Sequence, residues 1–75
     1  MVNSAKLRGR IIEKGYNNGE FADALDVSRV TLRKKIYGVR DFTASEIVKI
    51  CDLLDISRSE MPDYFFAQAV GKTET

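Results

Sequence analysis

The sequence predicts an all-α protein, a compact bundle of five helices. Apolar residues recur at helical spacing in one segment after another, and no stretch alternates apolar and polar residues as a half-buried strand would. Residues that start and stop helices separate these segments. The 75 residues, 44% hydrophobic and 31% charged, suffice for one small core. We therefore expect a single domain over residues 1–70 and a frayed tail at 71–75.

The first helix is expected at residues 4–14. Asn3 or Ser4 supplies the side-chain oxygen of an N-cap. Gly15 is a stop signal, because glycine adopts the left-handed backbone conformation at low cost. The expected inward stripe consists of Leu7, Ile11 and Ile12.

A second helix is expected at residues 18–25. Asn17 and Glu20 have the spacing of a capping box, with Asn in place of the usual Ser or Thr. The dipeptide Asn18-Gly19 also suits a hairpin turn, but neither flank alternates as a strand would. The expected inward face consists of Phe21, Ala22 and Leu25.

Asp26 then lies where the chain must turn sharply, and Asp tolerates a left-handed backbone better than most residues. Ser28 is a good N-cap for a third helix at residues 29–37, which Gly38 ends. Its expected inward positions are Leu32 and Ile36.

Two further capping boxes predict the last two helices. Thr43 and Glu46 start the fourth, and Ser57 and Glu60 start a short fifth helix, which Pro62 keeps brief. The inward face of the fourth helix is predicted to be Ile47, Ile50, Cys51 and Leu54.

Charge is distributed unevenly along the chain. Residues 1–40 hold nine Lys or Arg and four acids, whereas residues 41–75 hold three basic residues and seven acids. The stretch 29–40 has five basic residues and no acid. A molecule with one basic side suits an anionic polymer, although a solvated helix face would give the same pattern.

The second helix, the turn and the third helix together form a helix-turn-helix candidate. The stretch NGEFADALDVSRVTLRKKIYG (residues 18–38) resembles the phage Cro/repressor-type (XRE-like) helix-turn-helix family, and DFTASEIVKICDLLDIS (residues 41–57) is similar to that family's next helix. The resemblance covers residues 5–61, and MPDYFF (61–66) resembles a subgroup of small phage-type regulators from Gram-positive bacteria. Asn18, Asp26 and Lys35 depart from the family's usual Gln, Gly and apolar residue.

The resemblance implies a lambda-repressor-like fold and a sequence-specific regulator of transcription that binds a double-stranded DNA operator. The third helix would be the recognition helix in the major groove. Base contacts are then expected from Ser28, Arg29, Val30, Arg33 and Lys34. Phosphate contacts are expected from Asn18, Thr31, Lys35, Tyr37, Arg40 and Thr43, with Lys6 and Arg10 as weaker candidates. Replacing Arg29 or Arg33 by Ala should abolish operator discrimination.

Partners and location follow from the same resemblance. If the protein forms a homodimer, it would do so through the fifth helix and the aromatic residues Tyr64, Phe65 and Phe66, or on the DNA itself. A bacterial, cytoplasmic and nucleoid-associated protein, of phage, prophage or host origin, is expected. We expect no membrane segment, small-molecule substrate, cofactor or metal. With no His and one Cys, the nucleophile pairs and zinc sites that need them are excluded, and we expect no enzyme.

Two other functions remain open. A protein-interaction module would bind another regulator through the acidic C-terminal half and the aromatic tail. An RNA-binding or nonspecific nucleoid protein is less favoured, because the aromatic residues do not alternate with basic ones as stacking platforms would.

Overall fold

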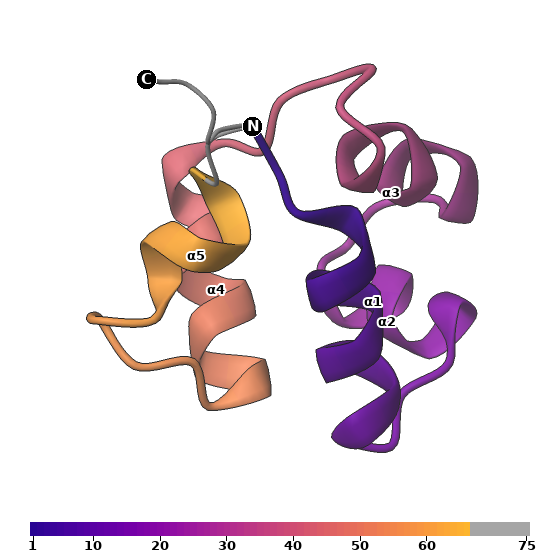
Figure 1. Cartoon of the computed structure of the whole chain (residues 1–75). Coiled ribbons are helices and arrows are strands. Elements are labelled where there is room, and N and C mark those ends of the chain that lie inside the picture. Colours follow the sequence, from indigo (N-terminus) through magenta and orange to yellow (C-terminus); the bar gives the residue numbers. More distant parts are fainter. Residues whose placement is uncertain (67–75) are drawn as a thin grey trace.

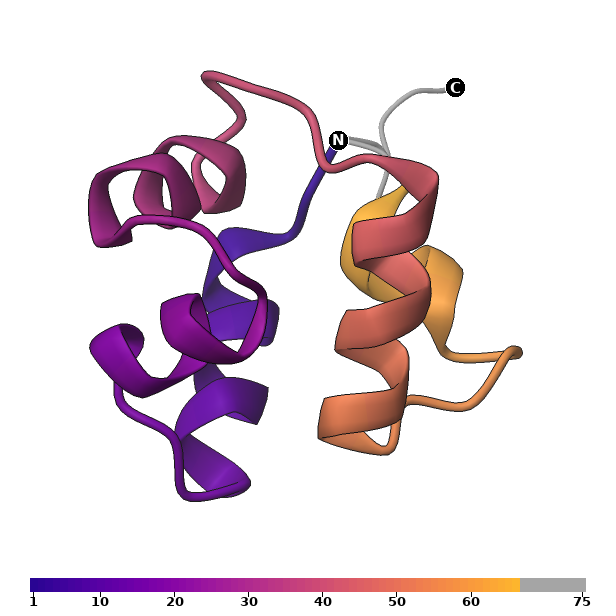
Figure 2. The same cartoon turned by 180° about the vertical axis from the view of Figure 1, so that it is seen from behind.

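The computed structural model describes residues 1–66, and over that range the chain is all-helical. The helices are α1 (Ser4–Glu13), α2 (Asn18–Ala24), α3 (Arg29–Ile36), α4 (Ala44–Leu54) and α5 (Met61–Phe65). α1 lies between two pairs, α2 with α3 and α4 with α5 (Figures 1 and 2). The expected tail at 71–75 lies outside the described residues.

Four helices begin at a side-chain cap. In each case a side-chain oxygen accepts a hydrogen bond, 2.8–3.2 Å long, from the backbone N–H three residues on. The caps are Asn3, Asn17, Ser28 and Thr43. At α2 and α4 the carboxylates of Glu20 and Glu46 accept the reciprocal bond, so two of the three predicted capping boxes are confirmed as helix starts. Asn3, not Ser4, caps α1, because the Ser4 hydroxyl donates to the carbonyl oxygen of Ile36 at 2.7 Å.

The same four helices end in one way. Each is followed by a residue with a left-handed backbone, and the next N–H returns to a carbonyl of the last turn. The left-handed residues are Gly15, Asp26, Gly38 and Asp55, with φ between 52° and 87°. Three of these positions were predicted. Asp55 was not, and it ends α4 because the N–H of Ile56 bonds the carbonyl oxygen of Cys51 at 2.9 Å.

The core draws on every helix. Its buried members are Leu7, Ile11, Phe21, Ala22, Leu25, Leu32, Ile36, Ile50, Leu54, Ile56, Tyr64 and Phe65. Ile47 and Cys51 pack against it half-buried. The prediction for Ile12 was wrong: its side chain is 72% exposed, because a residue next to buried Ile11 points about 100° away around the helix.

The fifth helix is shorter than the capping pattern predicted. Ser57 and Glu60 do exchange hydrogen bonds, which lower the pKa of Glu60, but they close a turn and α5 begins at Met61. Pro62 lies in the first turn of α5, where its missing N–H costs no helical bond.

α1 is tied to the C-terminal part of the described chain. The guanidinium of Arg10 donates to the carbonyl oxygens of Leu54 (2.8 Å) and Asp55 (2.9 Å) at the end of α4. The backbone N–H of Asn3 donates to the carbonyl oxygen of Tyr64 at 2.8 Å. Arg10 therefore caps the C-terminal end of α4. Its guanidinium donates to these carbonyl oxygens, so we do not retain Arg10 as a phosphate ligand.

Candidate nucleic-acid interface

The turn between α2 and α3 holds the basic helix in place. Asp26 has φ 60°, and the N–H of Val27 donates to the carbonyl oxygen of Ala22 at 3.0 Å. Ala22 is buried, as its place on the predicted inward face of the second helix requires. Leu32 and Ile36 turn one face of α3 into the core, so its other face is presented outward.

The outward face of α3 is basic. Arg29, Arg33 and Lys34 are exposed, and within residues 1–66 none of them makes an ion pair or a side-chain hydrogen bond. Since no acid lies between residues 29 and 40, their charges are not neutralised by a neighbour in sequence either. This face is available to an anionic partner.

Lys35 differs from the other basic residues of α3. Its ammonium lies 2.6 Å from both carboxylate oxygens of Glu46, and its side chain is only 11% exposed. Burial alone would raise the pKa of Glu46, but hydrogen bonds from Lys35 and Thr43 and the charge of Lys35 outweigh burial and lower it. Lys35 is thus a link between α3 and α4, and we do not retain it as a phosphate ligand.

Hydroxyl groups near this face already have partners. Ser28 Oγ accepts from the N–H of Thr31 and donates to its Oγ1 at 2.9 Å. Thr43 Oγ1 accepts from the N–H of Glu46 at 3.2 Å. Asn18 is exposed as the first residue of α2.

Arg29 reaches back from α3 onto α2. A Cβ atom placed on Gly19 would lie 2.5 Å from its Nη2 and 2.7 Å from its Nε, so the guanidinium rests directly on the bare glycine backbone. The absence of a side chain at position 19 makes this approach possible.

Arg29 is one of three arginines around a hollow of about 370 Å³ between α1, α2 and α3. Arg8 contributes from α1, and its guanidinium carbon lies 5.5 Å from the centre of the Tyr37 ring. The lining residues are Arg8, Asn18, Arg29, Leu32, Arg33, Ile36 and Tyr37. Sequence reasoning missed Arg8, because only the packing of α1 against α3 brings it here.

An apolar strip lies beside these cations. Val30, Tyr37 and Val39 are 63%, 49% and 71% exposed, and Arg33 and Lys34 border the same shallow depression. Val39 was not predicted. The outward face of α3 thus offers methyl groups between positive charges.

The family model described as "Protein of unknown function (DUF739)" matches residues 2–68, almost the whole chain. The chain belongs to the DUF739 family. No curated protein matches it.

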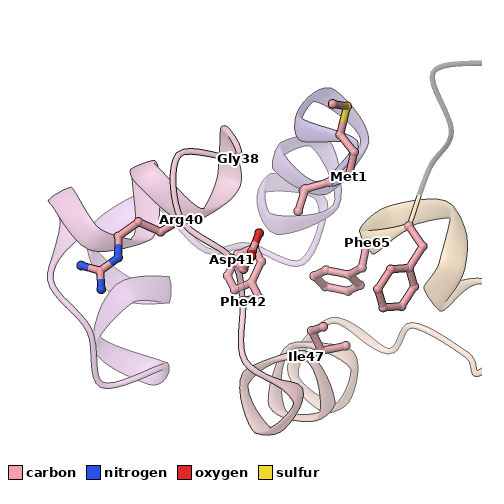
Figure 3. Close-up of a pocket in the computed structure, with 9 residues that line it drawn as sticks. Met1, Gly38, Arg40, Asp41, Phe42, Ile47 and Phe65 are labelled. Atoms are coloured by element: carbon pink, nitrogen blue, oxygen red, sulfur yellow. The ribbon is translucent and has the colours of Figure 1, made fainter.

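In this DUF739 protein the aromatic tail is divided between core and surface. Tyr64 and Phe65 are buried, and only Phe66 of the three rings is exposed. Phe65 and Phe66 border a second hollow, of about 530 Å³, together with Met1, Val2, Gly38, Arg40, Asp41, Phe42 and Ile47. The labelled ring of Phe65 lies near Phe42 and Ile47, whereas Arg40 points away from them (Figure 3). Of the three rings that were predicted to form a dimer surface, only Phe66 is therefore accessible to a partner.

Residues 1–66 contain no group of three potential metal ligands and no helix long and apolar enough to cross a membrane. Burial, and to a lesser extent the charge of Asp52, raises the pKa of the Cys51 thiol, which disfavours the reactive thiolate.

Proposed function

We propose that this protein is a sequence-specific, double-stranded DNA-binding transcriptional regulator of the Cro/repressor type. In this proposal α2 and α3 act as a helix-turn-helix, and α3 enters the major groove. The observation that carries it is the outward face of α3, with three exposed cations that have no acidic partner among residues 1–66.

The dimensions of α3 support the proposal. With its side chains an α-helix is about 10–12 Å in diameter, which fits the major groove of about 12 Å width, and the eight residues of α3 give about 12 Å of helix to lie in it. Val30 offers a methyl surface for thymine, and Arg33 and Lys34 offer donors for guanine. We assign base contacts first to these three residues, with Ser28 and Arg29 at the edge of the contact because their polar groups lie on Thr31 and Gly19.

Phosphate contacts would surround Val30, Arg33 and Lys34, the residues to which we first assign base contacts. Asn18, Tyr37 and Arg40 are exposed and face no acidic partner in the described chain, and Thr31 and Thr43 lie at helix starts. These contacts fix the position of the protein on the duplex without reading its sequence.

The test is selection of binding sites from random duplex DNA at two salt concentrations. A defined operator should emerge, and affinity for it should fall steeply with salt, because each neutralised phosphate adds about −0.9 to the slope of log K against log salt. Arg33→Ala and Lys34→Ala should each lower the ratio of operator to random-duplex affinity about tenfold or more, since one good base contact is worth about 1–3 kcal/mol.

Lys49→Ala, which removes an exposed lysine of α4, is the matched control and should change neither quantity. Replacing thymine by uracil in the selected operator, which removes only the methyl group, should weaken binding to the wild type and not to Val30→Ala. Equal selectivity in all variants would refute the assignment of base contacts to α3. Duplex binding without a preferred sequence would refute the proposal and favour a nonspecific nucleoid protein, and no duplex binding would favour the protein-interaction alternative.

A further inference from the structure

The hollow between α1, α2 and α3 collects positive charge. Three arginines, Arg8, Arg29 and Arg33, line it, and no carboxylate does. None of the three makes an ion pair within residues 1–66. Like charges brought together in this way repel one another, and a bound anion would relieve that repulsion.

The chemistry of the lining selects the anion. Guanidinium groups present planar pairs of N–H donors that match the oxygens of a phosphate. The side-chain amide of Asn18 and the hydroxyl of Tyr37 supply further polar groups at the same hollow, while Leu32 and Ile36 are buried and close its floor. A rim of donors above an apolar floor suits one phosphate group held at the surface.

The hollow lies next to the surface that, in our proposal, contacts the bases. Arg33 belongs both to the hollow and to the depression that contains Val30 and Lys34. A strand that follows the edge of the groove occupied by α3 would therefore pass beside α1. Arg29 belongs to α3, but its guanidinium rests on Gly19 of α2, at the hollow.

We propose that the hollow clamps one backbone phosphate of the DNA, and that Arg8 of α1 is a phosphate ligand outside the helix-turn-helix. The stacking of Arg8 on Tyr37 holds its guanidinium in position for this contact. Arg29 then contributes to affinity and little to base selectivity. This inference rests on the proposed function.

The test compares Arg8→Ala with Lys6→Ala, using the duplex chosen by selection and a scrambled duplex. Lys6 lies on the same helix, but it does not line the hollow, and its ammonium lies 4.9 Å from the centre of the Tyr64 ring of α5. We therefore do not retain Lys6 as a phosphate ligand, and it serves as the matched control. Arg8→Ala should lower the affinity for both duplexes about tenfold, leave their ratio unchanged and reduce the salt slope by about 1. Lys6→Ala should do none of these.

A scan with neutral methylphosphonate linkages supplies the decisive readout. Several positions should weaken wild-type binding, and at one of them Arg8→Ala should lose nothing more. Arg8→Lys, which keeps the charge without the paired donors, should fall between the wild type and Arg8→Ala.

A failure of the phosphate clamp and a failure of the proposed function give different results. If the wild type selects an operator but Arg8→Ala binds as tightly at every salt concentration, the clamp is refuted and the proposed function stands. If the wild type binds no duplex selectively, both fail. If millimolar inorganic phosphate binds the wild type and not Arg8→Ala, and binds equally well when the duplex is present, the hollow is a site for free anions and the assignment to DNA is wrong.

Discussion

Replacing Gly19 by Ala should separate the stability of the fold from its function. Gly19 is the second residue of α2 and does not have a left-handed backbone. A Cβ there would lie 2.5, 2.7 and 2.9 Å from Nη2, Nε and Cζ of Arg29, closer than real contacts allow. These atoms are the far end of a flexible, exposed side chain, so the guanidinium can move aside at little cost.

The gain in helix propensity should then dominate stability. Ala is preferred over Gly by about 1 kcal/mol in a helix interior, and we take about 0.5–1 kcal/mol near the N-terminus of α2. Gly19→Ala should therefore raise the melting temperature by about 2–8 °C in a domain of this size. Because Arg29 leaves the hollow, the affinity for DNA should fall about as much as in Arg29→Ala.

Thermal unfolding followed by circular dichroism measures the first effect, and duplex titration measures the second. Gly9→Ala is the control, since a Cβ on that glycine of α1 meets no atom within 4 Å: it should stabilise the fold by a similar amount and leave binding unchanged. Two results would contradict this prediction. One is a loss of stability of more than about 1 kcal/mol in Gly19→Ala. The other is that Gly19→Ala keeps full affinity for DNA while Arg29→Ala binds DNA more weakly.

Two further substitutions test the supports of α3. Glu46→Gln keeps an acceptor for the Thr43 N–H but leaves the Lys35 ammonium unpaired, and should cost about 1–3 kcal/mol at pH 7 in urea unfolding, less than for a fully buried pair. Because the pKa of Glu46 is lowered from 4.5 in the folded state, the stability that this group contributes is complete above its unfolded pKa and is lost as the pH falls through the folded value. The difference between wild type and variant should shrink below about pH 4.5, and a difference independent of pH would contradict the ion-pair assignment. At Asp26, with φ 60°, Gly should be tolerated to within about 0.5 kcal/mol, whereas Ala should cost about 1 kcal/mol more than Gly; equal melting temperatures for the two variants would show that the turn is not under this constraint.

Most of the fold was predictable because its signals are local. The capping boxes at Asn17 and Thr43 depend on residues three positions apart, and the turn at Asp26 depends on one backbone conformation. Such features depend on residues that are close together in the sequence, so the sequence pattern can predict them. Ser57 shows the limit: its hydrogen bonds formed as predicted, but they closed a turn and did not begin a helix.

The site was less predictable, because its details depend on packing between helices. The sequence does not distinguish Lys35 from the exposed basic residues beside it. Only the packing of α4 against α3 places Glu46 next to its ammonium group. Arg8 joins the hollow because α1 packs beside α3, and Arg10 is withdrawn because the end of α4 lies within its reach. Exposed basic residues could be named from the sequence, but their partners could not.

The ties between α1 and the far end of the chain have a consequence for synthesis on the ribosome. A nascent chain of about 40 residues already carries most of the positive charge, yet Arg10 would lack the carbonyl oxygens of Leu54 and Asp55, and Asn3 would lack that of Tyr64. Contacts this distant in sequence form only after the last segment has emerged. The domain therefore completes its fold only after residues 54–64 have left the ribosome, and until then its basic half lacks these contacts.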